Sequence, residues 1–81
     1  MKKNKKDIKK DLSLILKSLN KSYVNLSFKK NIFFDGFDSL DYLNLVFKIQ
    51  NKYKIKINNK ELHKLKTLDQ IMILILHKIK K

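Results

Sequence analysis

Apolar residues recur at helical spacing in three stretches of this chain, and almost nothing in the sequence would break a helix. The 81 residues include no proline and one glycine, Gly36. Apolar side chains three, four and seven positions apart form one face of an α-helix. Because tight turns depend on glycine and proline, this composition favours helices joined by short loops over a sheet. We therefore predict an all-α fold.

Two of these stretches lie toward the ends of the chain. We predict the first helix over 7–19, with one apolar stripe formed by Ile8, Leu12, Ile15, Leu16 and Leu19. We predict the last helix over 68–79, capped by Thr67. Its apolar face consists of Leu68, Ile71, Ile75 and Ile79. Lysines 9, 10 and 17 fall largely off the first stripe, so we expect them to be solvated.

The third stretch, 39–53, carries two apolar stripes instead of one. The first predicts a core face made of Tyr42, Leu45, Val46, Ile49 and Tyr53. The second, which we call the outer stripe, consists of Leu40, Leu43 and Phe47. In so small a protein, a helix with two apolar stripes either lies at the centre of the bundle or exposes one stripe to a partner.

Two longer connections complete the pattern. Residues 20–37 carry scattered apolar side chains without a period, and we expect this loop to pack over the core with a short helical turn. Residues 54–57 alternate as a strand does but have no partner strand, so we expect an extended connector whose isoleucines touch the core. Asn58 or Asn59 should then cap a short helix that continues through Leu65.

Length and composition exclude several classes of protein. We predict one domain over 1–81, with a flexible lysine-rich end at 1–6. No segment approaches the roughly 20 continuous apolar residues that span a bilayer, and the charged start does not resemble a secretory signal. The absence of cysteine excludes disulfides, thiolate metal sites and a catalytic cysteine. We therefore expect a cytoplasmic protein without stable membrane insertion.

The sequence contains no catalytic constellation. His63 and His77 lie far apart, each beside a lysine, and we expect both on the surface. Metalloprotease, phosphate-loop and serine-hydrolase motifs are missing. Asp35, Asp38 and Asp41 cluster, but their spacing is not that of a calcium-binding loop. We expect neither an enzyme nor a metal site.

The formal charge of +13 raises the alternative of a basic helical module that binds nucleic acid or an anionic membrane. However, all 20 basic residues are lysine, although arginine is the residue suited to bidentate contact with phosphates and guanine. The chain is also rich in Lys, Asn and Ile together, the amino acids of A/T-rich codons. Much of the charge is therefore explained by genome composition, and we expect no nucleic-acid partner.

The stretch Asp38-Ser39-Leu40-Asp41, preceded by Gly36, carries the clearest chemical signal. It resembles a capping box, in which Asp38 caps the first turn of a helix and Asp41 favours the positive end of its dipole. The serine at such a start has an exposed hydroxyl, and the unpaired backbone amides nearby suit a phosphate diester.

From this motif onward the chain resembles an acyl carrier protein. The resemblance runs through DSLDYLNLVFKIQNKY (38–53) and KIKINNKELHKLKTLDQIMILI (54–75) without a gap. It includes the glycine before the motif, the aromatic end of the helix and the approach to the last helix: Gly36, Tyr53, Ile55, Ile57, Glu61 and Leu65 to Leu68. The predicted first helix fits in length and stripe, although its residues are not diagnostic.

The resemblance implies a four-helix bundle with a long loop between helices 1 and 2 and a short third helix. It implies that Ser39 carries 4′-phosphopantetheine, transferred from coenzyme A by a separate, magnesium-dependent phosphopantetheinyl transferase. The thiol of that arm would hold acyl groups as thioesters. Asp38 would assist transferase recognition or metal placement, and partner enzymes would be met by Leu40, Asp41, Leu43 and Phe47.

The same resemblance implies a non-catalytic carrier that delivers acyl groups to acyl-loading and acyl-processing enzymes of fatty-acid, polyketide or related biosynthesis. The bundle interior would shelter the acyl chain, lined by Leu45, Val46, Ile71 and Ile75. An unmodified carrier that acts as an interaction subunit is a third hypothesis, and the intact Ser39 argues against it. We expect a monomer.

The chain departs from the family in its charge. Carrier proteins of this family are typically acidic along the second helix, whereas residues 38–53 contain two acids and two lysines, Lys48 and Lys52. Long-range steering toward a basic partner should therefore be weak, and the outer stripe must carry more of the recognition. The Asp35, Asp38 and Asp41 corner should be the acidic patch that the modifying enzyme meets.

Overall fold

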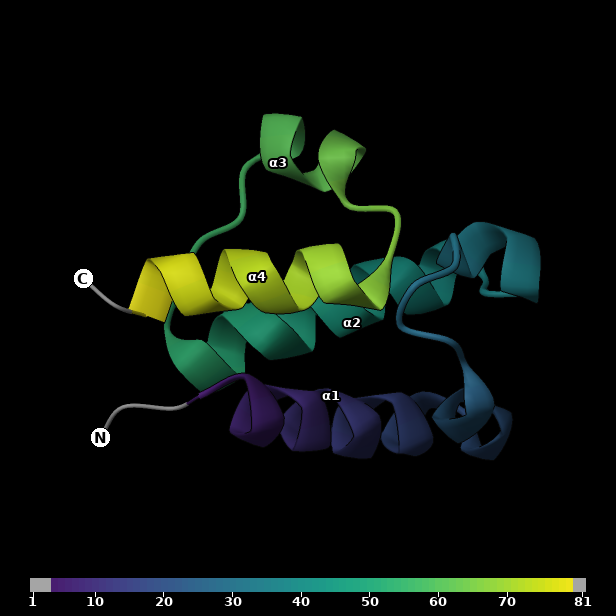
Figure 1. Ribbon diagram of the computed structural model, residues 1–81. Helices are drawn as coiled ribbons and strands as arrows, with labels where there is room; N and C mark the ends of the chain where they lie inside the picture. Colours follow the sequence, from purple (N-terminus) through teal and green to yellow (C-terminus); the bar gives the residue numbers. More distant parts are fainter. Residues whose placement is uncertain (1–3, 80–81) are drawn as a thin grey trace.

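The computed structural model describes residues 4–79, and within that range the chain is helical with no strand (Figure 1). The elements are α1 (Lys5–Leu19), η1 (Lys21–Asn25), η2 (Ile32–Asp35), α2 (Ser39–Tyr53), α3 (Asn59–Lys64) and α4 (Leu68–Ile79), where η denotes a 3₁₀ helix. α1 packs against both α2 and α4, and the short α3 lies at the edge opposite α1 (Figure 1). The predicted all-α bundle with four helices is confirmed.

α1 begins two residues earlier than the apolar stripe predicts. The Asn4 side chain accepts a hydrogen bond from the Asp7 amide at 2.9 Å, and the Asp7 carboxylate accepts one from the Asn4 amide at 3.3 Å. This reciprocal capping box stabilises a first turn that contains only polar residues. Of the lysine-rich end expected at 1–6, Asn4 caps α1 and residues 5 and 6 belong to its first turn, whereas residues 1–3 lie outside the described residues.

The long connection packs over the core, as predicted, and holds two helical turns instead of one. Tyr23, Ile32 and Phe37 are buried. The Ile32 amide donates to the Lys66 carbonyl at 2.9 Å, and the Asp69 amide donates to a carbonyl of the connection at 3.0 Å, so the segment is tied to the start of α4. Two of its side chains point outward, since Val24 and Phe34 are exposed.

Three helices supply most of the core. Its fully buried large side chains are Ile8, Leu12, Leu16, Ile32, Leu45, Ile49, Leu68, Ile71 and Ile75. No polar or charged residue of the described chain is buried. All its lysines are exposed except Lys78, which is partly buried, so the predicted solvated faces are confirmed. Two lysines also lie over aromatic rings of the long connection, Lys9 over Phe28 and Lys66 over Phe33.

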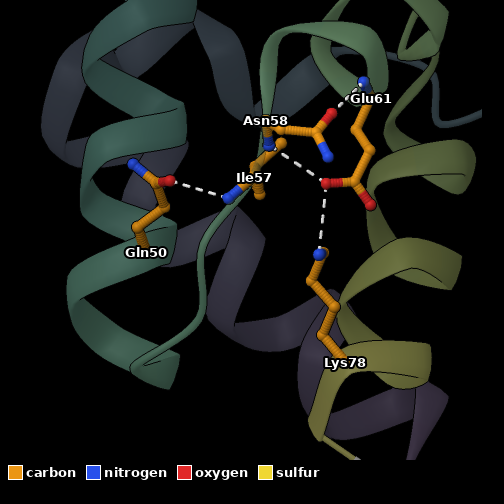
Figure 2. Close-up of polar contacts among 5 residues, drawn as sticks. All are labelled: Gln50, Ile57, Asn58, Glu61 and Lys78. Carbon is orange, nitrogen blue, oxygen red and sulfur yellow. Dashed lines mark hydrogen bonds and ion pairs between the residues drawn. The ribbon is translucent and has the colours of Figure 1, made fainter.

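α2 ends in a left-handed residue that redirects the chain into the extended connector. Lys54 has φ 56° and ψ 45°, and its amide donates to the Gln50 carbonyl. The Gln50 side-chain oxygen then accepts the Ile57 amide at 2.8 Å (Figure 2). Ile57 is buried and Ile55 is partly buried against the core. The predicted connector, with both isoleucines touching the core, is confirmed.

Glu61 links α3 to the end of α4. The Asn58 amide donates to Glu61 at 3.0 Å, the Glu61 amide donates to Asn58 at 2.8 Å, and the Lys78 ammonium lies 3.1 Å from the Glu61 carboxylate (Figure 2). The backbone hydrogen bond from Asn58, followed by the interaction with Lys78, lowers the pKa of Glu61. Asn58 is thus the cap of α3.

We predict that Glu61→Gln destabilises the protein at neutral pH and has less effect in acid. A carboxylate with a lowered pKa contributes stability above its unfolded value near 4.5, and that contribution is lost as the pH falls through the folded value. For a partly exposed pair the expected cost at pH 7 is about 0.5–1 kcal/mol. Urea unfolding at pH 7 and pH 3 measures it.

Lys78→Gln provides the matched test of the ion pair. In the Glu61→Gln background it should cause little further loss, since the partner charge is already gone. Equal losses from Lys78→Gln in both backgrounds would contradict the coupling between α3 and α4.

Candidate functional site

The start of α2 is set by a left-handed turn. Gly36 has φ 85° and ends η2, with its amide bonded to the Ile32 carbonyl. The next amide, that of Phe37, donates to the same carbonyl at 3.1 Å. Glycine occupies this conformation without the steric cost that other residues incur. The turn therefore buries Phe37 and directs the following residues out to the surface.

Asp38 and Ser39 occupy the cap and first position of α2. The Asp38 carboxylate accepts the Leu40 amide at 3.0 Å, and its carbonyl accepts the Tyr42 amide at 2.9 Å. Ser39 is exposed, and within the described chain its side chain makes no hydrogen bond. The hydroxyl is therefore accessible at the positive end of a 15-residue helix.

These residues fit a phosphodiester-linked group. An arm attached at Ser39 would extend into solvent without displacing a core side chain, because the residue is exposed. The amides of the first turn and the helix dipole favour a negative charge beside it. The Asp38 carboxylate lies next in sequence, where it can face a modifying enzyme, since it is also exposed.

Asp41 does not complete the predicted capping box. Its carboxylate accepts a hydrogen bond from the Tyr23 hydroxyl of η1 instead of bonding the Asp38 amide. On a helix, residues two positions apart lie about 200° apart around the axis, so Asp41 faces η1 while Ser39 faces away from it. The cap made by Asp38 and the place of Asp41 in the first turn of α2 are confirmed, but the reciprocal bond of a capping box is absent among the described contacts.

The outer stripe is exposed. Of the two predicted alternatives for α2, a central helix or a helix with one stripe open to a partner, the structure shows the second. Leu40 is 69% exposed, Leu43 57% and Phe47 63%. The opposite face is in the core, where Tyr42, Leu45, Val46 and Ile49 are buried and Tyr53 is half-buried. A patch of three large apolar side chains beside an exposed serine has the character of a docking surface.

Basic side chains line two grooves beside α2. A groove of about 260 Å³ between α2 and α3 includes Leu43 together with His63 and Lys66. On the side toward α1, a second groove includes Lys48 and Lys52. The acids near Ser39 whose side chains are described are Asp38 and Asp41. The Asp35 side chain, the third acid of the predicted corner, lies outside what the structure describes.

The four residues predicted to line an acyl chain meet in the core. Leu45, Ile71 and Ile75 are fully buried and Val46 is 5% exposed. They come from α2 and α4 and belong to the single core cluster, so the structure brings them together on the inward side of the helix that carries Ser39.

Other predicted features lie at the surface. His63 and His77 are exposed, as expected. Within residues 4–79, no group of three or more His, Cys, Asp or Glu side chains is arranged to hold a metal ion. No helix of that same range is long and apolar enough to cross a membrane.

Sequence reasoning missed the contribution of Tyr23. It treated this residue as one of several scattered apolar side chains, yet its hydroxyl bonds Asp41 and its ring packs against Phe37, with centroids 4.6 Å apart. The bond joins residues 18 positions apart across an aperiodic loop, so no short-range sequence pattern could have predicted it.

The comparisons with known proteins agree with this geometry. A family model described as "Phosphopantetheine attachment site" matches residues 13–75. The matched range includes the whole of α2, with Asp38 and Ser39 at its start, and the whole of α3. No curated protein and no solved structure matches the chain.

We predict that Phe47→Ala leaves the fold almost as stable as the wild type. Truncation of a buried phenylalanine costs about 3–5 kcal/mol, but Phe47 is 63% exposed, so the loss should be well below that range. The matched control is Ile49→Ala on the core face of the same helix, which should cost about 2–5 kcal/mol. Urea unfolding compares the two, and a Phe47→Ala loss as large as that of the control would place the outer stripe in the core.

Proposed function

Because the chain belongs to the phosphopantetheine attachment site family, whose members carry covalently attached 4′-phosphopantetheine, we propose that it transports acyl groups as thioesters on such an arm attached to Ser39. The family match establishes the carrier role. The attachment residue, the cargo class and the partners are the proposal.

The observation that carries the assignment to Ser39 is its position. It is an exposed serine at the first position of a long helix, preceded by a capping acid, with a side chain that bonds nothing within the described residues. In the transfer its hydroxyl oxygen would form the bond to the pantetheine phosphate and lose its proton, while the pyrophosphate bond of coenzyme A breaks and the adenosine bisphosphate leaves. A chain without cysteine would gain its thiol from the arm.

The neighbouring residues support roles in recognition. Asp38 is the exposed acid next to Ser39 and is proposed to be read by a phosphopantetheinyl transferase. Leu40, Leu43 and Phe47 are exposed on the same helix and are proposed to enter apolar sockets of acyl-loading and acyl-processing enzymes. Asp41, engaged by Tyr23, would contribute at the edge of that contact.

The surroundings of the outer stripe support partners of a particular kind. Lys66 lines the groove that contains Leu43, and Lys48 follows Phe47 directly in α2, so an acidic or neutral rim on the partner suits docking better than a basic rim. We propose that these partners belong to fatty-acid, polyketide or related acyl biosynthesis. We further propose that the carrier is a monomer in the cytoplasm and has no catalytic activity of its own.

We predict that the wild type gains the mass of phosphopantetheine when incubated with coenzyme A, magnesium and a broad-specificity transferase. Ser39→Ala should gain none, because the accepting oxygen is removed. Ser18→Ala, which alters another exposed serine at the end of α1, should be modified like the wild type. Intact-protein mass spectrometry gives the result. An increment that persists in Ser39→Ala would refute the attachment site.

The exposure of the lysines favours one second candidate, a basic module that binds nucleic acid or anionic membranes. That function requires tight binding whose logarithm falls with the logarithm of salt concentration with a slope of several units. We expect only weak binding to duplex DNA and to anionic vesicles at 150 mM salt, since arginine is absent from the sequence. A filter-binding and vesicle-sedimentation titration at two salt concentrations distinguishes the two functions.

A further inference from the structure

One tyrosine contacts the chain on both sides of Ser39. The Tyr23 hydroxyl donates to the Asp41 carboxylate, two residues after the serine. The Tyr23 ring packs against Phe37, two residues before it, with centroids 4.6 Å apart and planes inclined by 48°. The first turn of α2 and the residue that leads into it are thus held by the same side chain.

Tyr23 is itself firmly placed. It is 7% exposed, and its amide donates to the Asn20 carbonyl at 3.0 Å. Asn20 in turn caps η1 through its side chain and donates its amide to the Leu16 carbonyl of α1 at 3.0 Å. An unbroken series of hydrogen bonds therefore connects the end of α1 to the start of α2 through Tyr23.

The contact is a charge-assisted hydrogen bond. The bond to Asp41 and the burial of the ring both raise the pKa of Tyr23. The phenol is therefore neutral at physiological pH and acts as the donor to the Asp41 carboxylate. Asp41 is drawn toward η1, on the side of α2 away from Ser39.

We propose that Tyr23 is a positioning residue for the modification of Ser39: by holding Asp41 and Phe37 it fixes the first turn of α2 in the orientation that presents the serine hydroxyl. This inference rests on the proposed function of Ser39. It adds a residue from the long loop, outside the motif, that acts through Asp41 and not on the reacting atoms.

The molecule supplies a matched control at the other end of the same helix. The Tyr53 hydroxyl donates to the Asp11 carboxylate of α1 at 2.5 Å. Tyr53 is also partly buried and its pKa is also raised, by burial first and then by Asp11. Tyr23→Phe and Tyr53→Phe therefore remove the same kind of bond at opposite ends of α2.

The kinetic test measures transfer of phosphopantetheine to each variant as the substrate of a broad-specificity transferase. Misplacement of a reacting group lowers the rate of the chemical step steeply, so Tyr23→Phe should lower kcat about five- to tenfold with KM nearly unchanged, because the outer stripe is intact. Tyr53→Phe should stay close to the wild type in both constants. Equal kcat values for the two variants, or a change confined to KM, would overturn the proposal.

The route through Asp41 is tested by a double-mutant cycle. If Tyr23 acts through this carboxylate, Tyr23→Phe should cause little further loss of kcat in an Asp41→Ala background. Asp41→Asn, which keeps an oxygen that can accept the hydroxyl, should retain more activity than Asp41→Ala. Additive losses in the cycle would overturn the assigned route.

Amide hydrogen exchange decides the positioning role independently of transfer. The Tyr42 amide, bonded to the Asp38 carbonyl in the first turn, should exchange faster in Tyr23→Phe than in Tyr53→Phe. Equal exchange would overturn the positioning role. A wild type that gains no phosphopantetheine would instead refute the proposed function of Ser39, so the two failures are distinguishable.

Discussion

The left-handed turn at Gly36 is the constraint on which the exposed site depends. It ends η2, turns Phe37 into the core and leaves Asp38 and Ser39 outside. A residue with a Cβ would meet no neighbouring atom there, so the requirement for glycine comes from the backbone angle alone. A helix started one residue earlier or later would rotate by about 100° and turn its core face away from the core.

That rotation matters because α2 has two apolar faces and the sequence does not say which is buried. Leu45 and Ile49 on one side and Leu43 and Phe47 on the other have similar hydrophobicity. The structure resolves the choice through contacts from other elements: α1, α4 and the long connection cover the first face, and the second is uncovered among the described residues. Periodicity identifies stripes, but tertiary packing decides which stripe is inside.

The same distinction explains how much of the molecule could be predicted. The bounds of α2 and α4 were predicted as they are, because apolar period, cap and end all agree for these helices. The start of α1 was missed because its first turn is polar and depends on the Asn4–Asp7 capping box. The bond between Tyr23 and Asp41 could not be predicted, because it depends on how an aperiodic loop folds back over α2.

The structure also separates the charge of the chain from its fold. No charged residue of the described chain is buried, so the core imposes little restraint on the sign of the surface charge, and lysines can accumulate at the surface without loss of packing.

The two described acids of the motif, unlike the surface lysines, are held by hydrogen-bond donors of the fold. Asp38 is bonded to a helix amide and Asp41 to a tyrosine hydroxyl, so each is held by a donor within the fold. Their geometry therefore does not depend on an acidic surface, and recognition of Ser39 can rest on short-range contacts while the overall charge is strongly positive.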